Sequence, residues 1–217
     1  MMGAEGSPVP NAYDHIADQW HAHPGRFGAR KYLDLMLEGL RPGARVLDLG
    51  CGTGEPVALY LIGKGFRVVG VDESAAMLEI ARRVVPEAEL IEGDMCDVEF
   101  AGVFDAAIAW DSLFHVERAH HRAVYRKIYG ALAPGGRLLL STGGTGHPGF
   151  TSEMYGRTFF YSGFEPGEVL RLLASEGFEV ELCEVDDPSS LGHLAVVARK
   201  AGGARSRPGD NLEGGRP

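Results

Sequence analysis

Short apolar runs alternate with longer helix-like stretches along most of the chain. The apolar runs predict seven buried strands, at residues 45–49, 67–72, 88–94, 104–111, 137–142, 178–185 and 193–200. The stretches between them predict helices over residues 55–65, 74–85, 117–133 and 165–177. Ser74 suits the N-cap of the second helix, and Pro86 would end that helix. Pro166 is well placed in the first turn of the last helix.

The order of these elements predicts the topology. Nearly continuous apolar strands separated by helices are typical of a parallel sheet that is covered on both faces. Only the residues "DDPSSLG" separate the last two strands, which is too short for a crossover between parallel strands. We therefore predict the α/β class: a doubly wound, mostly parallel sheet of seven strands whose last strand is antiparallel.

The length of 217 residues suits a single domain with one large core. The folded body is predicted to span residues 11–200, because residues 1–10 and 201–217 lack the pattern of a core and are expected to be disordered. Residues 143–164 follow the fifth strand as a long, irregular segment, with five aromatic side chains between 154 and 164. Such a segment in a compact domain is usually functional, so we interpret it as a substrate-loop insertion.

Charge and cysteine content limit the partners. The net charge of −9 disfavours binding to nucleic acid, and no run of Lys or Arg could form a basic patch. The three cysteines are widely spaced and form neither a disulfide framework nor a C-x-x-C site. The N-terminal residues lack the apolar core of a signal peptide, and no apolar run approaches the length of a membrane span. We therefore expect a cytoplasmic protein without a membrane or nucleic-acid partner.

A glycine-rich turn follows the first strand in "VLDLGCGTGEP", where a doubly wound sheet usually binds its ligand. A dinucleotide loop has glycine at its sixth position, but the sixth residue from Gly50 is Glu55, whose charge would repel a pyrophosphate. Asp72 ends the second strand, where a carboxylate can accept both ribose hydroxyls. Asp94 ends the third, within reach of an adenine amine, and Met95 can lie against the ring. Together these residues indicate an adenosine without phosphate.

The chain resembles the class I S-adenosylmethionine-dependent methyltransferases in these residues and in several further segments. The matching segments are "VLDLGCGTG", "VVGVDESAAML", "EGDM", "FDAAIAWDSLFHV", "LAPGGRLLLSTGG" and the final "GFEVELCEV…GHLAVVARK". They follow one another in the family's order over roughly residues 11–199. The resemblance implies a Rossmann-like methyltransferase fold and S-adenosylmethionine as the cofactor. "AYDHIADQW" resembles the amphipathic segment that often covers this cofactor, so residues 11–35 are expected to form a lid.

The resemblance also implies the cofactor-binding residues. The loop would wrap the methionine part of the cofactor through Asp48, Gly50, Cys51, Gly52 and Gly54. Asp72 would hold the ribose hydroxyls and Glu73 would lie beside the adenine, while Asp94 and Met95 would contact its amine and ring. The carbonyl of Trp110 would receive the amino group, and Tyr13 would cover the carboxylate end. After the fourth strand stands "WDSLFHV" in place of the Asn/Asp-Pro-Pro-aromatic motif used on exocyclic base nitrogens, which disfavours a base-modifying enzyme.

The residues that would contact the methyl acceptor are indicated less directly by the sequence. His115 follows the fourth strand and is our candidate general base, with packing as the alternative. The aromatic segment suggests an acceptor pocket, although it could equally form a lid that touches no substrate. His193 opens the last strand and is assigned to the same cleft, with packing again the alternative. His120 and His121 are expected at the surface, and no metal site is predicted. The proposed acceptor-binding residues are Tyr155, Phe160, Tyr161 and His193.

The sequence thus predicts an enzyme that methylates a small molecule on O, N, C or S. RNA or protein methylation is one alternative and would need a basic face around the cleft. A non-catalytic cofactor-binding partner of another subunit is a second alternative. A nicotinamide oxidoreductase is disfavoured by Glu55 and by the reversed final strands. The fold does not select the acceptor or the oligomeric state.

Overall fold

A computed structural model describes residues 11–23, 27–187 and 192–202 of the chain. The expected disordered segment 1–10 and nearly all of 201–217 lie outside the described residues. The described elements, in chain order, are η1 (Ala12–His15), α1 (Ala17–Ala22), α2 (Arg30–Leu37), β1 (Arg45–Leu49), α3 (Val57–Gly63), β2 (Arg67–Asp72), α4 (Ala75–Val84), β3 (Glu89–Glu92), β4 (Phe104–Ala109), η2 (Leu113–His115), α5 (Arg118–Ala131), β5 (Leu132–Gly143), β6 (His147–Met154), β7 (Arg157–Gly163), α6 (Pro166–Ser175), β8 (Phe178–Asp187) and β9 (His193–Lys200).

The main sheet has seven strands in the order β3-β2-β1-β4-β5-β9-β8. The first five strands in that order pair in parallel, and β9 is antiparallel to both β5 and β8. The predicted α/β class, the seven strands and the antiparallel last strand are therefore confirmed. The switch in strand order at β1 and β4 opens a crevice at their carboxyl ends, where open α/β sheets bind ligands.

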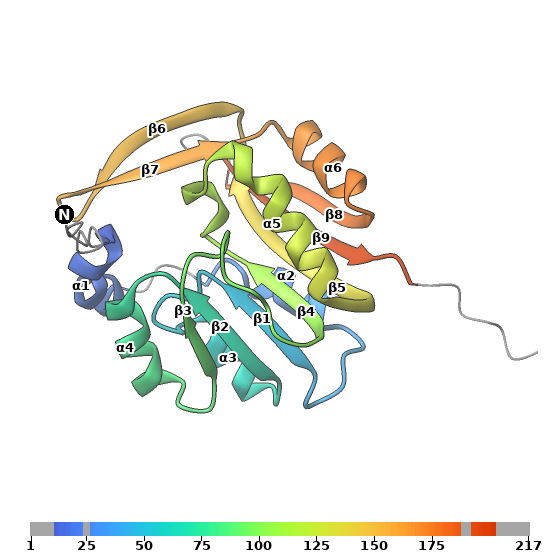
Figure 1. Cartoon of the computed structure of the whole chain (residues 1–217), viewed down its shortest axis with the longest axis horizontal. Helices are drawn as coiled ribbons and strands as arrows, with labels where there is room; N and C mark the ends of the chain where they lie inside the picture. Colours follow the sequence, from blue (N-terminus) through green and yellow to red (C-terminus); the bar gives the residue numbers. More distant parts are fainter. Residues whose placement is uncertain (1–10, 24–26, 188–191, 203–217) are drawn as a thin grey trace, which may run out of the picture.

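Helices cover both faces of the sheet (Figure 1), and a hydrophobic cluster fills each of the two layers between them. Apolar faces of α2, α3 and α4 pack on one side, around Leu33, Leu61 and Val46. On the other side, α5 and α6 pack around Tyr125 and Leu140. Each strand of the sheet centre contributes alternate residues to the two layers, which is why its sequence is almost continuously apolar. Ser74 caps α4 by accepting a bond from the Met77 amide, as its sequence position indicates.

Residues 147–163 form a β-hairpin where the sequence analysis expected an irregular segment. Strands β6 and β7 pair antiparallel and extend from the end of β5 toward α1 (Figure 1). The two residues between the strands, Tyr155 and Gly156, have φ values of 51° and 70°. Positive φ at both positions is the geometry of a tight hairpin turn, and glycine at the second makes it accessible. The Tyr155-Gly156 turn is a sequence signal for a hairpin, and the expectation of an irregular segment overlooked it.

His121 is buried, which corrects its expected place at the surface. It is 0% exposed and lies on the face of α5 that includes Val124, Tyr125 and Ile128. Its Nε2 lies 3.0 Å from the Val116 carbonyl, and its ring packs against Phe164. The helical spacing of this face turns His121 inward, while His120 stays exposed.

No helix within the described ranges is long and apolar enough to cross a membrane. The cysteines are free thiols: Cys51 is buried, and Cys96 and Cys183 are partly buried.

Candidate functional site

The loop after β1 is held against the sheet by glycines in a left-handed conformation. Gly50 has φ 73°, and a Cβ there would stand 2.3 Å from the Ser112 Cβ. Gly54 has φ 79°, and a Cβ there would stand 2.6 Å from Val85 Cγ2. The Gly50 amide donates to the Val71 carbonyl at 2.7 Å, which ties the loop to the end of β2. A side chain at either glycine would therefore push the loop off its support.

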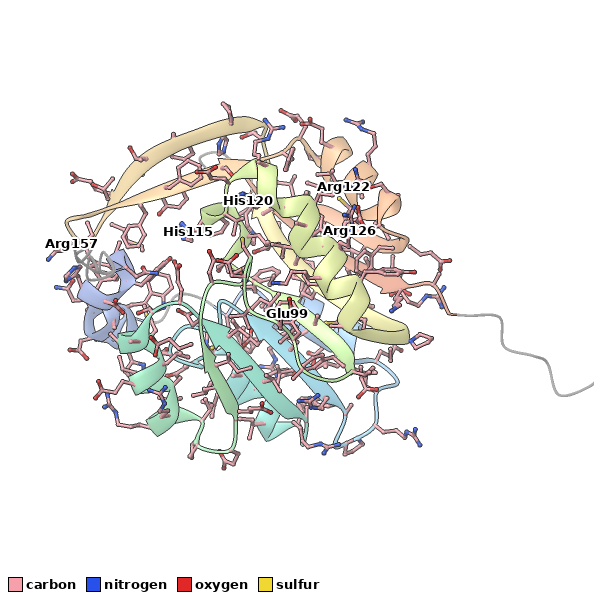
Figure 2. All side chains as sticks on the ribbon, viewed as in Figure 1. Glu99, His115, His120, Arg122, Arg126 and Arg157 are labelled. Atoms are coloured by element: carbon pink, nitrogen blue, oxygen red, sulfur yellow. The ribbon has the colours of Figure 1, made fainter. Side chains whose placement is uncertain are left out.

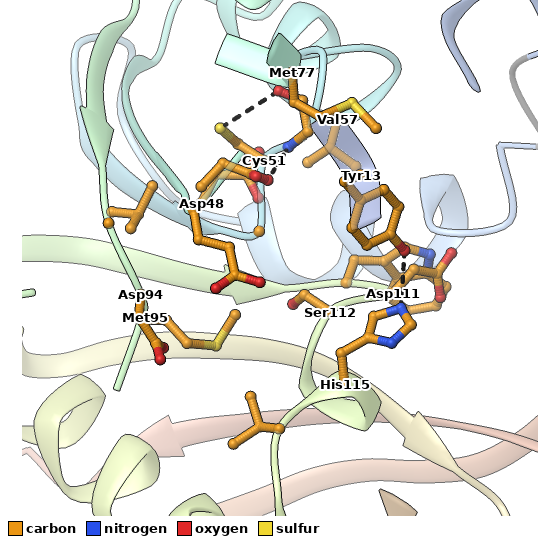
Figure 3. Close-up of a pocket in the computed structure, with 18 of the residues that line it drawn as sticks. Tyr13, Asp48, Cys51, Val57, Met77, Asp94, Met95, Asp111, Ser112 and His115 are labelled. Atoms are coloured by element: carbon orange, nitrogen blue, oxygen red, sulfur yellow. Dashed lines mark hydrogen bonds between the residues drawn. The ribbon is translucent and has the colours of Figure 1, made fainter. Parts of the chain in front are cut away.

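A cavity of about 410 Å³ opens beside this loop, at the carboxyl ends of β1, β2 and β4. Figure 3 shows Asp94 and Met95 toward one side of the cavity and Tyr13, Asp111 and His115 toward the other. Gly54 supports the loop from outside the lining. The sequence-predicted residues that line the cavity are Tyr13, Asp48, Gly50, Cys51, Gly52, Asp72, Glu73, Asp94, Met95, Trp110 and His115.

Asp72 joins the glycine loop to α4. Its Oδ2 accepts a hydrogen bond from the Gly52 amide at 2.8 Å, and its Oδ1 accepts one from the Ser74 amide at 2.9 Å. Burial raises the pKa of Asp72, and the two backbone bonds oppose that rise. At the end of β3, Asp94 Oδ1 accepts from the Cys96 amide at 2.7 Å. Both carboxylates are thus oriented by main-chain donors: Asp94 by its own turn, and Asp72 by its own turn and by the glycine loop.

Asp48 is a carboxylate that the described residues leave partly unsatisfied. Its side chain is 2% exposed, and Oδ2 is buried with no hydrogen-bond partner in the described structure. Burial, and then the nearby charge of Asp72, raise its pKa to about 7. A buried, unpaired carboxylate at a cavity wall is costly unless a ligand with donors or positive charge fills the cavity.

Tyr13 and His115 form a hydrogen-bonded pair on the cavity wall. His115 Nδ1 lies 2.8 Å from the Phe160 carbonyl, and its Nε2 lies 2.8 Å from the Tyr13 hydroxyl. Because a carbonyl can only accept, Nδ1 holds the proton and Nε2 accepts from Tyr13. Burial lowers the pKa of His115, and it also raises the pKa of Tyr13. Both side chains are therefore neutral near pH 7.

The hairpin contacts this pair from outside the cavity. Phe159 is 4% exposed, and its ring packs on Tyr13 with the ring centroids 4.8 Å apart. The Tyr161 ring lies against His115, while Tyr155 stands exposed at the hairpin turn. Figure 2 shows His115 below the hairpin, in η2, which precedes α5. None of the proposed acceptor-binding residues lines the cavity: Tyr155, Phe160, Tyr161 and His193.

His193 lies beside the cavity between two carboxylates. Its Nε2 is 2.8 Å from Asp111 Oδ1, and its Nδ1 is 2.5 Å from Asp186 Oδ1. Its ring also meets the edge of Trp110, with centroids 5.0 Å apart. The side chain thus contacts the site through Asp111 and Trp110.

Several further side chains line the cavity that the sequence analysis did not place there. Asp111 and Ser112 lie two and three residues after the end of β4, so the rule that located Asp72 and Asp94 at strand ends could have found them. Trp20 lies in α1 on the same N-terminal segment as Tyr13. This group includes Trp20, Met77, Asp111, Ser112, Glu117 and His120.

Comparisons with known proteins agree with this geometry. Residues 46–136 match the family model of the methyltransferase domain. Trans-aconitate 2-methyltransferase of Paracidovorax citrulli is 33% identical over 112 residues, covering 46% of this chain and 39% of that protein. Demethylmenaquinone methyltransferase of Beutenbergia cavernae is 35% identical over 134 residues, covering 61% and 54%. The chain therefore spans only about two fifths to half of the length of these curated relatives.

The solved structure of the DhpI–SAH complex superposes with a TM-score of 0.65 at 26% identity, over 87% of this chain and 93% of that one. The chain thus resembles the S-adenosylmethionine-dependent methyltransferases in fold, and residues 46–136 match the methyltransferase domain.

The lining of the cavity fits S-adenosylmethionine, the cofactor of the methyltransferases that the chain resembles. Asp72 and Asp94 offer two carboxylates at the ends of β2 and β3, and the unpaired Oδ2 of Asp48 suits a ligand that brings donors or positive charge. A Cβ at Gly52 would meet open space, so the loop presents bare backbone there. Among the described residues, no group of His, Cys, Asp and Glu has the arrangement of a metal site.

Proposed function

We propose that this methyltransferase transfers a methyl group from S-adenosylmethionine to a small-molecule acceptor. The observation that supports it most is that one cavity has Asp94 and Met95 toward one side and the Tyr13–His115 pair toward the other (Figure 3). Its volume of about 410 Å³ is in the range of small-ligand sites. A cofactor and a small acceptor would therefore meet in one partly enclosed space.

In this proposal the chain mainly binds the cofactor and the acceptor, aligns them with each other and excludes water. Asp72 holds the ribose, Asp94 and Met95 hold the adenine, and the loop from Asp48 to Gly54 surrounds the amino-acid tail. When bound, S-adenosylmethionine supplies a methyl group that its sulfonium charge has already activated. The segment with Tyr13 closes the site, because Asp14 accepts a bond from the Ser74 hydroxyl at 2.6 Å and so docks on α4.

His115 is the proposed general base. The Phe160 carbonyl fixes its Nδ1–H tautomer, and its lowered pKa keeps Nε2 unprotonated at neutral pH. The Tyr13 hydroxyl donates to that nitrogen in the structure. An acceptor therefore either replaces the Tyr13 hydroxyl at His115 or passes its proton to His115 through that hydroxyl. Acceptors that lose a proton on methylation, such as hydroxyls and amines, would need this pair.

The small size of the proposed acceptor is supported by the relatives and by charge. Two relatives are named for trans-aconitate and demethylmenaquinone, both small molecules. The net charge of −9 disfavours RNA, because phosphates would be repelled. We propose no specific acceptor.

The test is a turnover screen with S-adenosylmethionine and a panel of phenols, amines, thiols and carboxylic acids, read by mass spectrometry of the methylated product. For an acceptor that loses a proton, we expect His115→Asn to lower kcat by about 10²- to 10⁴-fold and to leave the cofactor Kd unchanged. The exposed His15→Asn variant is the matched control and should retain kcat. Undiminished turnover in His115→Asn would remove the base assignment. Methylation of RNA or protein alone would favour that alternative, and cofactor binding without any turnover would favour a non-catalytic partner.

A further inference from the structure

The charged side chains of the cavity lining are of one sign. No Lys or Arg lies among the described lining residues, and none in the described chain forms a salt bridge with a lining carboxylate. Only histidines approach them: His21 Nδ1 lies 4.0 Å from Glu55 Oε2, and His193 Nε2 lies 2.8 Å from Asp111 Oδ1. The lining carboxylates are Asp48, Glu55, Asp72, Glu73, Asp94, Asp111 and Glu117.

Two cationic side chains border this lining without reversing its sign. Lys127 Nζ donates to two main-chain carbonyls of lining residues, at 3.1 and 2.8 Å, and does not reach a carboxylate of the cavity. His193 lies between Asp111 and Asp186 and so faces more negative charge than it can balance. At the cavity wall, Asp48 Oδ2 is buried and has no hydrogen-bond partner in the described structure. The lining therefore keeps an excess of negative charge.

S-adenosylmethionine would balance only part of this charge. The cofactor carries a sulfonium, an ammonium and a carboxylate, so its net charge is a single positive one. The carboxylates of Glu55 and Glu117 also line the cavity, and neither is assigned to the ribose, the adenine or the amino-acid tail. Glu55 faces α1, and Glu117 lies two residues after His115. With the cofactor bound, the site would still attract a second cation and repel an anion.

Aromatic rings share the lining with these carboxylates. Tyr13, Trp20 and Trp110 all line the cavity, and the rings of Tyr13 and Trp20 meet edge to face with their centroids 6.0 Å apart. The face of an aromatic ring attracts a cation, and proteins use gathered aromatic rings to bind ammonium ligands. Both the charge and the aromatic character of the lining thus favour an ammonium group, and neither favours a carboxylate.

The Tyr13–His115 pair can take the proton that an ammonium must lose. An ammonium nitrogen has no lone pair, so it attacks a methyl group only after deprotonation. His115 Nε2 is free of a proton, because Nδ1 donates to the Phe160 carbonyl and Nε2 accepts from Tyr13. A bound sulfonium would favour the loss of the proton, because a like charge lowers the pKa of an ammonium. One site thus attracts a cation and can deprotonate it.

We propose that the methyl acceptor is an amine, which enters the cavity as an ammonium cation and is methylated on nitrogen. This inference rests on the proposed function and narrows its acceptor to one chemical class. Glu55 and Glu117 attract the cation, and the Tyr13–His115 pair removes its proton. Carboxylic acids are excluded as acceptors, although one relative is named for trans-aconitate.

The transfer conserves atoms and charge. The ammonium gives one proton to His115 Nε2, either directly or through the Tyr13 hydroxyl, which takes this proton as it gives up its own. The freed lone pair forms a bond to the methyl carbon, and the carbon–sulfur bond breaks with its electron pair left on sulfur. The products are a methylammonium cation, S-adenosylhomocysteine and a proton that His115 releases to water.

The test uses sets of three acceptors that share a carbon skeleton and differ in charge, such as benzylamine, benzyl alcohol and benzoic acid, together with aliphatic sets of the same kind. The protein is incubated with methyl-labelled S-adenosylmethionine, and mass spectrometry locates the label. We expect label on the nitrogen of amines, with a kcat/KM at least about tenfold above that of the matching alcohol or acid.

Label on alcohols or acids but not on amines would overturn the inference and leave methyl transfer to small molecules in place. A protein that binds the cofactor yet labels no compound of any set would contradict the proposed function itself.

Charge variants test the attraction directly. With the best amine of the panel, Glu55→Gln and Glu117→Gln should each raise KM by about two- to fivefold and leave the Kd of S-adenosylmethionine within about twofold of its value in the unchanged protein. The kcat/KM for the amine should also fall as salt is added. Glu99→Gln, at an exposed carboxylate outside the lining (Figure 2), is the control and should match the unchanged protein. An unchanged KM in both lining variants, or a kcat/KM that does not depend on salt, would overturn the inference.

Discussion

At the scale of single residues, the carboxylates of the cavity differ in how they are satisfied. Asp72 receives two backbone hydrogen bonds, whereas Asp48 has a buried oxygen with no partner in the described structure. A protein without ligand therefore bears an electrostatic cost at Asp48 that a cationic cofactor would relieve. This difference leads to a prediction about pH and stability.

Asp48→Asn should stabilise the ligand-free protein at high pH. The pKa of Asp48 is about 7 in the folded chain, above its ordinary value of 3.8. Between these values the folded state binds more protons than the unfolded state, so stability falls as pH rises through this window. Removing the charge should make the variant more stable than the unchanged protein by about 1–3 kcal/mol at pH 8, measured by urea denaturation, and by little at pH 4. The same difference at both pH values would contradict the raised pKa.

At the scale of elements, the buried strands of the main sheet were predictable and the hairpin was not. The boundaries of β1, β2 and β9 agree with their apolar runs, because both faces of these strands are covered. Strands β6 and β7 pair only with each other, and β6 is mostly exposed, so no apolar run marks it. The turn at Tyr155 and Gly156 was the only local signal.

A side chain should destabilise the protein more in the loop after β1 than in an open turn. In Gly50→Ala, the new Cβ meets Ser112 and the residue keeps a positive φ, so we expect a loss of at least about 2 kcal/mol in unfolding free energy. Gly39→Ala is the control, since Gly39 has a φ of 80° but open space around a Cβ. Its loss should be about 1 kcal/mol, from the backbone alone. Equal losses in the two variants would show that contact with Ser112 does not matter.

The hairpin should stabilise the site through Phe159 and not through its tip. Phe159→Ala would empty a buried position against Tyr13 and His115, with an expected loss of about 3 kcal/mol and weaker cofactor binding. Tyr155→Ala, at a side chain that is 45% exposed, should cost less than about 0.5 kcal/mol. Thermal denaturation and calorimetry of the two variants provide the comparison. A Phe159 variant as stable as the Tyr155 variant would mean that the hairpin does not support the pair.

At the scale of the whole molecule, the site joins segments that are far apart in the chain. Tyr13 comes from η1, His115 from η2 and the Phe160 carbonyl from β7. The lining by the glycine loop, Asp72 and Asp94 was predictable, because these three follow the neighbouring parallel strands β1, β2 and β3. The acceptor side was not, because pattern and spacing say nothing about how a hairpin and an N-terminal segment meet over the sheet. Phe160 thus contacts the site through its backbone carbonyl, whereas the sequence had suggested that its ring binds the acceptor.

The most direct measurement is calorimetric titration of the protein with S-adenosylmethionine, beside Asp72→Ala and the control Glu99→Gln, an exposed carboxylate outside the cavity lining. The account predicts saturable binding by the unchanged protein and by Glu99→Gln. It predicts an affinity at least about tenfold weaker in Asp72→Ala, because the ribose hydroxyls and the Gly52 amide lose their acceptor. Absence of binding by the unchanged protein, or equal affinity in all three proteins, would contradict the claim that this cavity holds the cofactor through Asp72.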